Sequence, residues 1–398
     1  MREFTLEEAE RTAGLNNAAL LAAEQDIVIA QQRVQEARFL FFPEVGLQAS
    51  ASRYNARYPF ALAPEFRSVL LFPSDLDGVY SGRGYLRQPL YEGGRYINLL
   101  RLAQTALKQA RTQYETVKMD VASNAKRMFY RLLLAQHTQA AVAARLETAR
   151  QVLARGLSGW ERVETEALVA ELRSRDTAAR RAGDAARLEL VRTLNLELDT
   201  PIHVTGLLQT QPVDIELDKL ILWATELRPE LQAETYRAQM DAIAVNLALG
   251  RRNPTLVLGA DYELTGQRFP LRQNNWDLTV GLRIPFSYDF WTQLKQKRAE
   301  QRQGDIKRAE IHDQVKLEVR QAYEALQFWQ REWPLRDDEH KRLERLAESS
   351  KDWGPPGLQA LRAQLGMLGA EERWLTAVQE HLLARVRLER AVGRALGR

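Results

Sequence analysis

Hydrophobic and polar positions follow two periods along this chain. Long segments place apolar residues three and four positions apart, as one face of an α-helix does, and shorter segments alternate at every residue, as half-buried β-strands do. The helical period predicts a first helix over about 5–41 and long helices over about 92–154 and 290–350, each long one followed by a turn and a returning helix. The alternation predicts strands over about 44–58, 79–91, 255–266 and 275–287. The strand over 79–91 alternates poorly and is predicted chiefly by symmetry with the strand over 275–287.

The two halves of the chain repeat one another. At a constant shift of 211 residues, Leu6, Ala13, Leu20, Val34, Pro43 and Leu47 recur as Leu217, Ala224, Leu231, Val245, Pro254 and Leu258. We expect a first structural repeat over 1–197, a linker over 198–216 and a second repeat over 217–398. Two units of half a chain are too long and too few for a solenoid, so the pattern indicates one pseudo-symmetric molecule.

Capping residues and prolines mark the helix ends. Thr5 is expected to be an N-cap with Glu8 as its partner in a capping box. Pro43 and Pro254 are expected to end the helices before them, because proline pushes the preceding residue out of the α region. The apolar stripe of the helix over 92–154 recurs every 3.6 residues, which predicts a nearly straight helix of roughly 90 Å.

The four strands are too few to form a closed structure alone. About eight strands are needed to enclose even a packed interior, and an open sheet leaves unpaired edges. Several copies could each contribute four strands to a shared barrel and four helical segments to a shared tube. The apolar face (Val45, Leu47, Trp276, Leu278, Val280) would then face lipid, and the polar face (Asp261, Glu263, Asp277, Arg283) a wet lumen. A soluble sandwich, or a hairpin packed on a helical bundle, explains the alternation equally well.

Composition narrows the function class. Apolar residues make up 45% of 398 residues, and no segment approaches the roughly 18 uninterrupted apolar residues of a spanning helix. Basic and acidic residues number 56 and 52 and are mixed along the chain, unlike the basic stripe of a nucleic-acid-binding protein. There is no cysteine, and the five histidines lack metal-ligand spacing. The Gly93-Gly94 pair lacks the Lys-Ser/Thr of a phosphate loop, so we expect no enzyme, no cofactor and no metal.

Several short motifs, in this order and with this duplication, carry a resemblance to a known family. They are FTLEEA at 4–9, ARFLFFPEVGL at 37–47, QPLYEGGR at 88–95 and RIPF at 283–286. The chain resembles the TolC-like outer-membrane efflux proteins, also called outer membrane factors, over essentially its whole length. The resemblance implies a mainly α fold with a β-barrel portion: a homotrimer with a twelve-stranded transmembrane barrel and a long periplasmic α-helical barrel. It also implies docking onto a periplasmic adaptor (membrane fusion) protein and an inner-membrane pump.

The turns after the long helices resemble the family's adaptor-docking tips. Leu153, Arg155, Gly156 and Leu157 form the first tip, although a plain helix C-cap explains the glycine as well. Trp353 and Gly354 lie in the second turn, whose two prolines depart from the family pattern. Glu161 and Glu164, just past the first tip, are candidate periplasmic gate residues because three copies would form a ring of carboxylates. A solvated helix face explains them too.

These observations favour a subunit of an outer-membrane channel that extends into the periplasm and passively conducts substrates outward. The N-terminus has no apolar signal core, so a cytoplasmic location, or an export signal removed upstream, is expected. Two alternatives remain: a non-exporting envelope scaffold of the same fold, and a cytosolic helical interaction protein. The loop between Tyr58 and Tyr80 is about fifteen residues longer than its counterpart in the second half and is expected to face the cell exterior.

Overall fold

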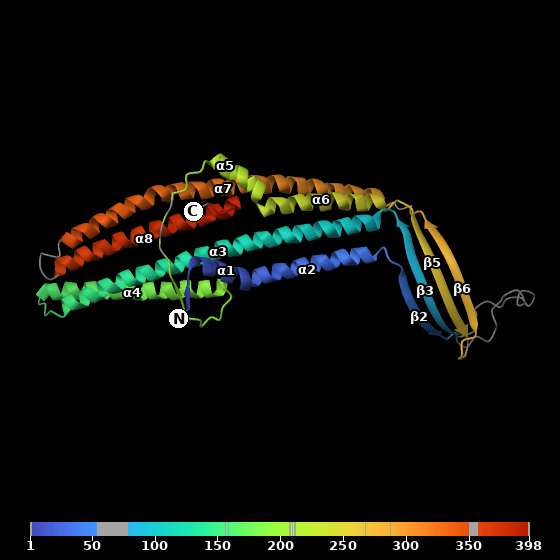
Figure 1. The fold of residues 1–398 in the computed structure, drawn as a ribbon, viewed down its shortest axis with the longest axis horizontal. Helices are drawn as coiled ribbons and strands as arrows, with labels where there is room; N and C mark the ends of the chain where they lie inside the picture. The colour runs from blue at the N-terminus through green and yellow to red at the C-terminus, as the bar shows by residue number, and fades with distance from the viewer. Residues whose placement is uncertain are drawn as a thin grey trace, which may run out of the picture. The chain divides into compact units, whose positions relative to one another are not determined.

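A computed structural model describes residues 2–53, 79–155, 157, 159–206, 208, 210, 212–266, 268–286, 288–349 and 357–396 (Figure 1). The first half contains α1 (Leu6–Asn16), α2 (Ala18–Phe39), β2 (Glu44–Ser52), β3 (Val79–Glu92), α3 (Arg95–Leu153) and α4 (Gly159–Thr193). The second half contains α5 (Leu217–Leu227), α6 (Pro229–Gly250), β5 (Thr255–Gly266), β6 (Gln273–Arg283), α7 (Phe290–Ser349) and α8 (Leu358–Val392). The two halves therefore have the same order of elements, and α5 and α6 keep the bounds of α1 and α2 shifted by 211 residues.

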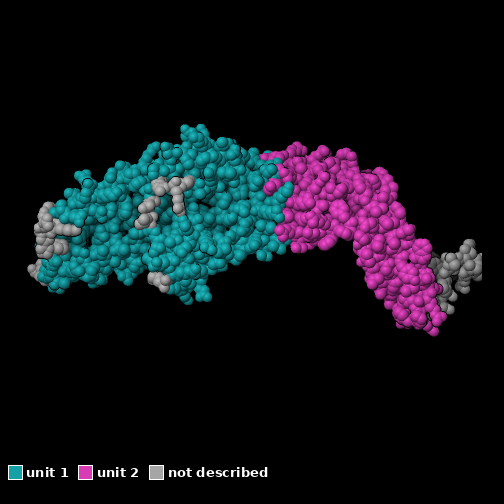
Figure 2. All heavy atoms as spheres, in the orientation of Figure 1, with its two compact units in different colours: residues 1–28, 108–235, 306–398 teal, residues 29–107, 236–305 magenta. Residues whose placement is uncertain are grey.

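Contacts divide the chain into two compact units that each draw on both halves (Figure 2). Unit 1 comprises residues 1–28, 108–235 and 306–398 and is helical apart from two short strands. Unit 2 comprises residues 29–107 and 236–305 and contains the four longer strands with the helix ends that flank them.

The predicted single helix over 5–41 is wrong, because a break at Asn17 divides it into α1 and α2. Asn17 has extended backbone (φ −62°, ψ 126°), and its side chain accepts a hydrogen bond from the Ala19 amide at 3.0 Å. An asparagine that caps the next helix competes with helical continuation. At the equivalent break, Arg228 precedes Pro229 and is likewise extended. The capping box of Thr5 and Glu8 is confirmed.

The segment expected to be only a linker contains a strand, β4 (Ile202–Val204), which pairs in parallel with β1 (Arg2–Phe4). Neither three-residue strand was predicted. Two of the longer strands also end earlier than predicted. The strand predicted over 44–58 stops at Ser52, and the one predicted over 275–287 runs from Gln273 to Arg283, two residues before Pro285. Proline cannot donate to a ladder, which accounts for the early end of β6. Positions 54–58 of the first predicted strand lie outside the described residues.

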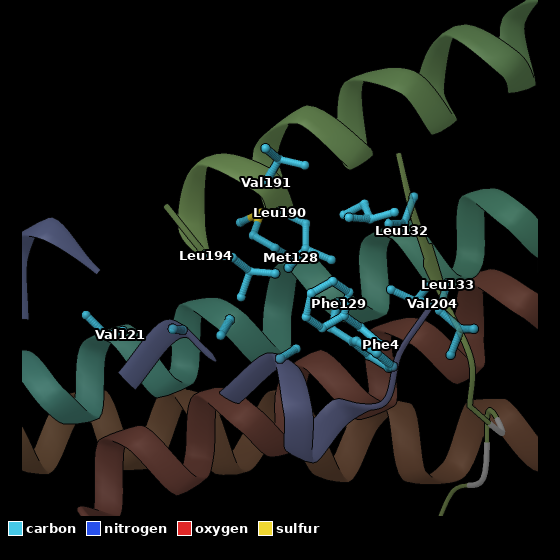
Figure 3. Close-up of a cluster of buried hydrophobic side chains, with 14 residues drawn as sticks. Phe4, Val121, Met128, Phe129, Leu132, Leu133, Leu190, Val191, Leu194 and Val204 are labelled. Atoms are coloured by element: carbon cyan, nitrogen blue, oxygen red, sulfur yellow. The ribbon is translucent and has the colours of Figure 1, made fainter. Parts of the chain in front are cut away.

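Three hydrophobic clusters are buried in unit 1, and two of them repeat one another. In the first, Phe4 and residues of α4 pack on one stripe of α3 (Figure 3). The second cluster uses α5, α7 and α8 in the same way. The stripe residues Val121, Ala125, Met128 and Leu132 of the first cluster correspond to Val315, Val319, Ala322 and Leu326 of the second at a constant shift of 194. Both helix pairs thus bury equivalent positions of their long helix.

Two aromatic pairs join α7 to α8 in unit 1. Trp333 lies 6.3 Å from His381 between ring centroids, and His340 stacks on Trp374 at 4.9 Å. His381 is fully buried, and neither of its ring nitrogens has a hydrogen-bond partner among the described residues. Burial, reinforced by the charge of Arg385, lowers the pKa of His381 to about 4. The folded protein therefore holds a neutral imidazole here.

Acid should destabilise the protein through His381. The unfolded chain protonates this histidine below about pH 6.5 and the folded chain only near pH 4, so stability falls as the pH drops between those values, by about 3 kcal/mol in total. His381→Phe should remove this part of the pH dependence in urea unfolding measured from pH 7 to pH 4. The control His137→Gln, at an exposed position of α3, should leave the slope unchanged. An unaltered slope in His381→Phe would contradict the assignment.

Candidate functional site

The four longer strands form one antiparallel sheet in the order β2-β3-β5-β6. The central pair, β3 and β5, joins the first half of the chain to the second. Within the described part of the chain, β2 and β6 pair on one side only, so each leaves an open edge. Such edges present unpaired backbone donors and acceptors and template pairing with another strand.

In the register of this sheet, the apolar strand residues lie on one face. Directly opposed residues share a face, and the partners run from Leu47 through Gly84 and Tyr262 to Trp276. All five residues predicted to face lipid lie on this face and are exposed in the single chain: Val45 70%, Leu47 91%, Trp276 74%, Leu278 66% and Val280 65%. An exposed apolar face of this size marks an interaction surface.

The opposite face of the sheet is polar. Arg83 forms an ion pair with Asp261 across β3 and β5, with 2.5 Å between Nη2 and Oδ1. The other residues predicted to face a lumen, Glu263, Asp277 and Arg283, occupy the same face by register. The sheet therefore separates an uncharged surface from one that carries both signs of charge.

Junctions between helices and strands in unit 2 carry exposed aromatic residues, which the sequence alone did not mark as a feature of the site. They are Phe39, Phe41, Phe42, Tyr91, Phe286, Tyr288 and Trp291. At one junction Gly93 adopts φ +63°, and a Cβ there would lie 2.8 Å from the Gly250 carbonyl oxygen. Asn253 donates a hydrogen bond to the Gly93 carbonyl at 3.0 Å. This close approach requires glycine and links the junctions of the two halves.

The structure describes only part of the predicted tips. Leu153 ends α3, and it packs with Leu157 against a buried cluster that includes Leu361 and Leu368 of α8. Arg155 is exposed. Gly156, Trp353 and Gly354 lie outside the described residues.

The candidate gate residues differ in their surroundings. Glu161 is exposed in the first turn of α4. Glu164 is paired with Arg362 of α8, whose Nε lies 2.6 Å from the Glu164 carboxylate. The sequence alone did not predict this pairing, because the two residues are 198 positions apart.

Among the described residues, the helices lack any stretch with the length and hydropathy of a membrane-spanning segment. A family model described as outer membrane efflux protein matches residues 11–195, just under half of the chain. Residues 11–195 are therefore similar to outer membrane efflux proteins. The resemblance seen in the sequence motifs is thereby confirmed. No curated protein sequence matches the chain.

Solved structures of outer membrane channels have the same fold as this chain over nearly its whole length. The CmeC channel of Campylobacter jejuni superposes with a TM-score of 0.80 at 16% identity, covering 98% of this chain and 85% of CmeC. VceC of Vibrio cholerae gives 0.76 at 15% identity, covering 98% and 97%. The open state of the Neisseria gonorrhoeae MtrE channel gives 0.77 at 16%, covering 99% and 90%. At these identities the likeness establishes the fold.

Proposed function

We propose that the chain is one subunit of a homotrimeric outer-membrane channel in an export system, passively conducting substrate from the periplasm to the exterior. The sheet of unit 2 would contribute four strands to a twelve-stranded transmembrane barrel, and the helices would enclose a periplasmic tunnel. The family match over residues 11–195 supports a channel role in efflux and an outer-membrane location.

The sheet carries this proposal. It combines an exposed apolar face with an opposite charged face and two open edges, which is the arrangement of a transmembrane barrel segment before closure. In hydrocarbon every backbone polar group must be paired, so β2 of one copy would pair with β6 of the next until the barrel closes. Three copies of four strands give an even number within the range of known bacterial barrels.

The apolar face also has a suitable height. Tyr80 and Tyr91 lie on this face near opposite ends of β3 and are 39% and 47% exposed. A bulge between Pro89 and Tyr91 brings Tyr91 onto this face, opposite Leu256, ten residues along β5 from Gly266. The two tyrosines are therefore about 34 Å apart at about 3.4 Å per residue, and a tilt of about 40° reduces this to about 26 Å. Outer-membrane barrels carry an apolar band about 25 Å tall between aromatic girdles. The aromatic residues at the strand-to-helix junctions would then lie at the periplasmic interface.

The partners and the gate follow from the helix turns. We assign adaptor docking to the first tip, with Leu153, Arg155 and Leu157, and energy input to an inner-membrane pump behind the adaptor. Glu161 and Glu164 would line the periplasmic mouth in three copies. Because Arg362 holds Glu164, the link between α4 and α8 would also hold the mouth closed until docking breaks it.

Substitutions on adjacent residues of β6 distinguish a lipid face from a soluble one. Leu278→Arg places a charge on the apolar face and should reduce the membrane-inserted fraction, by about 2–4 kcal/mol if the residue lies at mid-bilayer. Thr279→Arg, one residue later on the polar face, should insert normally. The readout is the heat-resistant trimer recovered from outer-membrane fractions. Equal recovery of the two variants would contradict a lipid-facing Leu278.

Conductance tests export directly. In planar bilayers the wild-type channel should show small or rare openings, and Glu164→Gln combined with Arg362→Gln should conduct more, because the α4–α8 link is lost. Glu166→Gln, two residues away on α4, should lose only an exposed pair with Arg162 and leave the α4–α8 link intact, so it serves as the control. A trimer that inserts but never conducts, with or without the link, would contradict the channel role and favour the non-exporting scaffold.

A further inference from the structure

A pocket of about 700 Å³ in unit 1 is lined by arginines from three separate helical regions. Arg127 comes from α3, Arg228 from the junction of α5 and α6, and Arg387 and Arg390 from α8. Asp120 and Glu318 are the acidic residues of the lining. Arginine therefore outnumbers carboxylate by two in the wall of this pocket.

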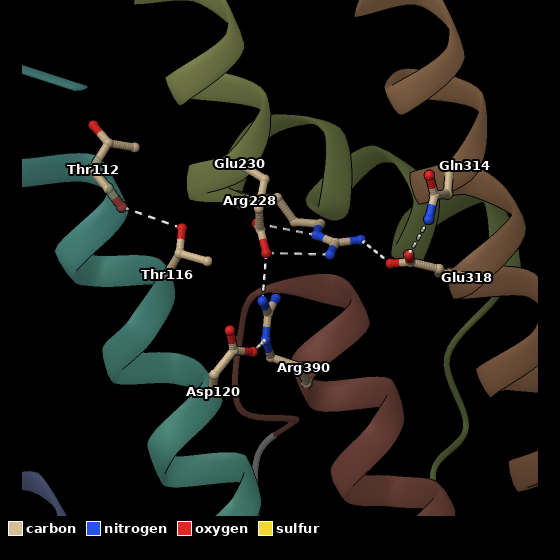
Figure 4. Close-up of polar contacts among 8 residues, drawn as sticks. All are labelled: Thr112, Thr116, Asp120, Arg228, Glu230, Gln314, Glu318 and Arg390. Carbon is tan, nitrogen blue, oxygen red and sulfur yellow. Dashed lines mark hydrogen bonds and ion pairs between the residues drawn. The ribbon is translucent and has the colours of Figure 1, made fainter. Parts of the chain in front are cut away.

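Two of the four arginines are held by carboxylates (Figure 4). Arg228, only 7% exposed, donates to Glu318 at 2.7 Å and to Glu230 at 3.3 Å. Arg390 donates to Asp120 at 2.5 Å and also to Glu230. Burial alone would raise the pKa of Glu230, but hydrogen bonds from both arginines lower it below its ordinary value. Glu230 is therefore ionised, and all three carboxylates already bind arginines of the wall.

The remaining donors have no acceptor in the described part of the chain. Arg127 and Arg387 make no hydrogen bond or ion pair there, and Nη1 of Arg390 is buried without a partner. Burial and the neighbouring charges of Arg131 and Arg387 lower the pKa of Arg127. Arg131 is engaged elsewhere, 3.4 Å from Glu189. The fold thus assembles unpaired guanidinium groups at a cost, since like charges close together destabilise the folded state.

We propose that this pocket binds a small phosphate-type oxyanion between Arg127, Arg387 and Nη1 of Arg390. Planar guanidinium groups match the paired oxygens of phosphate or carboxylate groups and bind them with charge-assisted hydrogen bonds. A phosphate-type oxyanion offers several oxygens to these three donor groups, whereas chloride carries a single charge and has no pair of oxygens to match a guanidinium. Arg228 and its acids would fix the wall rather than contact the anion. This site lies within unit 1 and does not depend on the proposed channel function.

The test uses detergent-solubilised full-length protein and inorganic pyrophosphate as the probe, with sodium chloride at matched ionic strength as the reference. Pyrophosphate should raise the melting temperature and show saturable binding by isothermal titration calorimetry. Arg127→Gln and Arg387→Gln should each weaken that binding about tenfold or more, as expected for loss of a charged hydrogen bond. The matched control Arg181→Gln, on the exposed face of α4, should bind as the wild type does.

Stability without the probe separates a binding role from a structural one. In chloride alone, Arg127→Gln should melt at the same temperature as the wild type or higher, because it removes an unpaired charge. A lower melting temperature would mean that Arg127 stabilises the fold and would contradict a binding role. Equal pyrophosphate binding by all variants would show that the anion does not bind in this pocket. If Arg127→Gln and Arg387→Gln instead change the oligomeric mass, the arginines serve acidic side chains of a second copy, which would also overturn the proposal.

Discussion

Backbone groups of β2 and β6 that find no partner among the described residues are the constraint on which the rest of the structure depends. A four-stranded sheet satisfies its inner ladders and leaves two rows of donors and acceptors, which a hydrocarbon environment does not tolerate. The same sheet exposes Leu47, Trp276 and Leu278 on one face and places Arg83 and Asp261 on the other. Pairing of the edges between copies would satisfy the backbone hydrogen-bonding groups. It would also place the apolar face in lipid and the charged face in water. Backbone hydrogen bonding thus favours an oligomer, and the apolar face favours a membrane as its surroundings.

Within unit 1 the two halves of the chain pack their helices in the same way. Each long helix buries a stripe of four equivalent residues against a shorter returning helix, and the shift of 194 between the stripes differs from the shift of 211 between the first helices. The difference reflects extra residues between β2 and β3. Ion pairs between the two halves are the contacts that do not repeat. Examples are the pairing of Glu164 with Arg362 and the arginines around Glu230.

Sequence periodicity predicted the elements that bury a regular stripe or alternate over many residues. The strand β3 was harder, because Gly82 and Gly84 interrupt its alternation, and only the register shows that they continue the apolar face. The break at Asn17 was missed because a capping side chain leaves the apolar period almost intact. The strands β1 and β4 were missed because each has three residues and is defined by a partner about 200 positions away. The predicted lipid-facing residues share one exposed face, whereas the Arg362 partner of Glu164 and the arginine pocket depend on contacts that no local pattern encodes.

The mass of the detergent-extracted protein tests the central claim most directly. Native mass spectrometry should give three times the chain mass of 45.6 kDa, about 137 kDa, with no stable monomer once the protein is removed from membranes. That result would mean that the open edges of the sheet are closed between three copies. A monomer or dimer that leaves the membrane fraction without detergent would contradict the shared barrel, and the exposed apolar face would then have to be covered in another way.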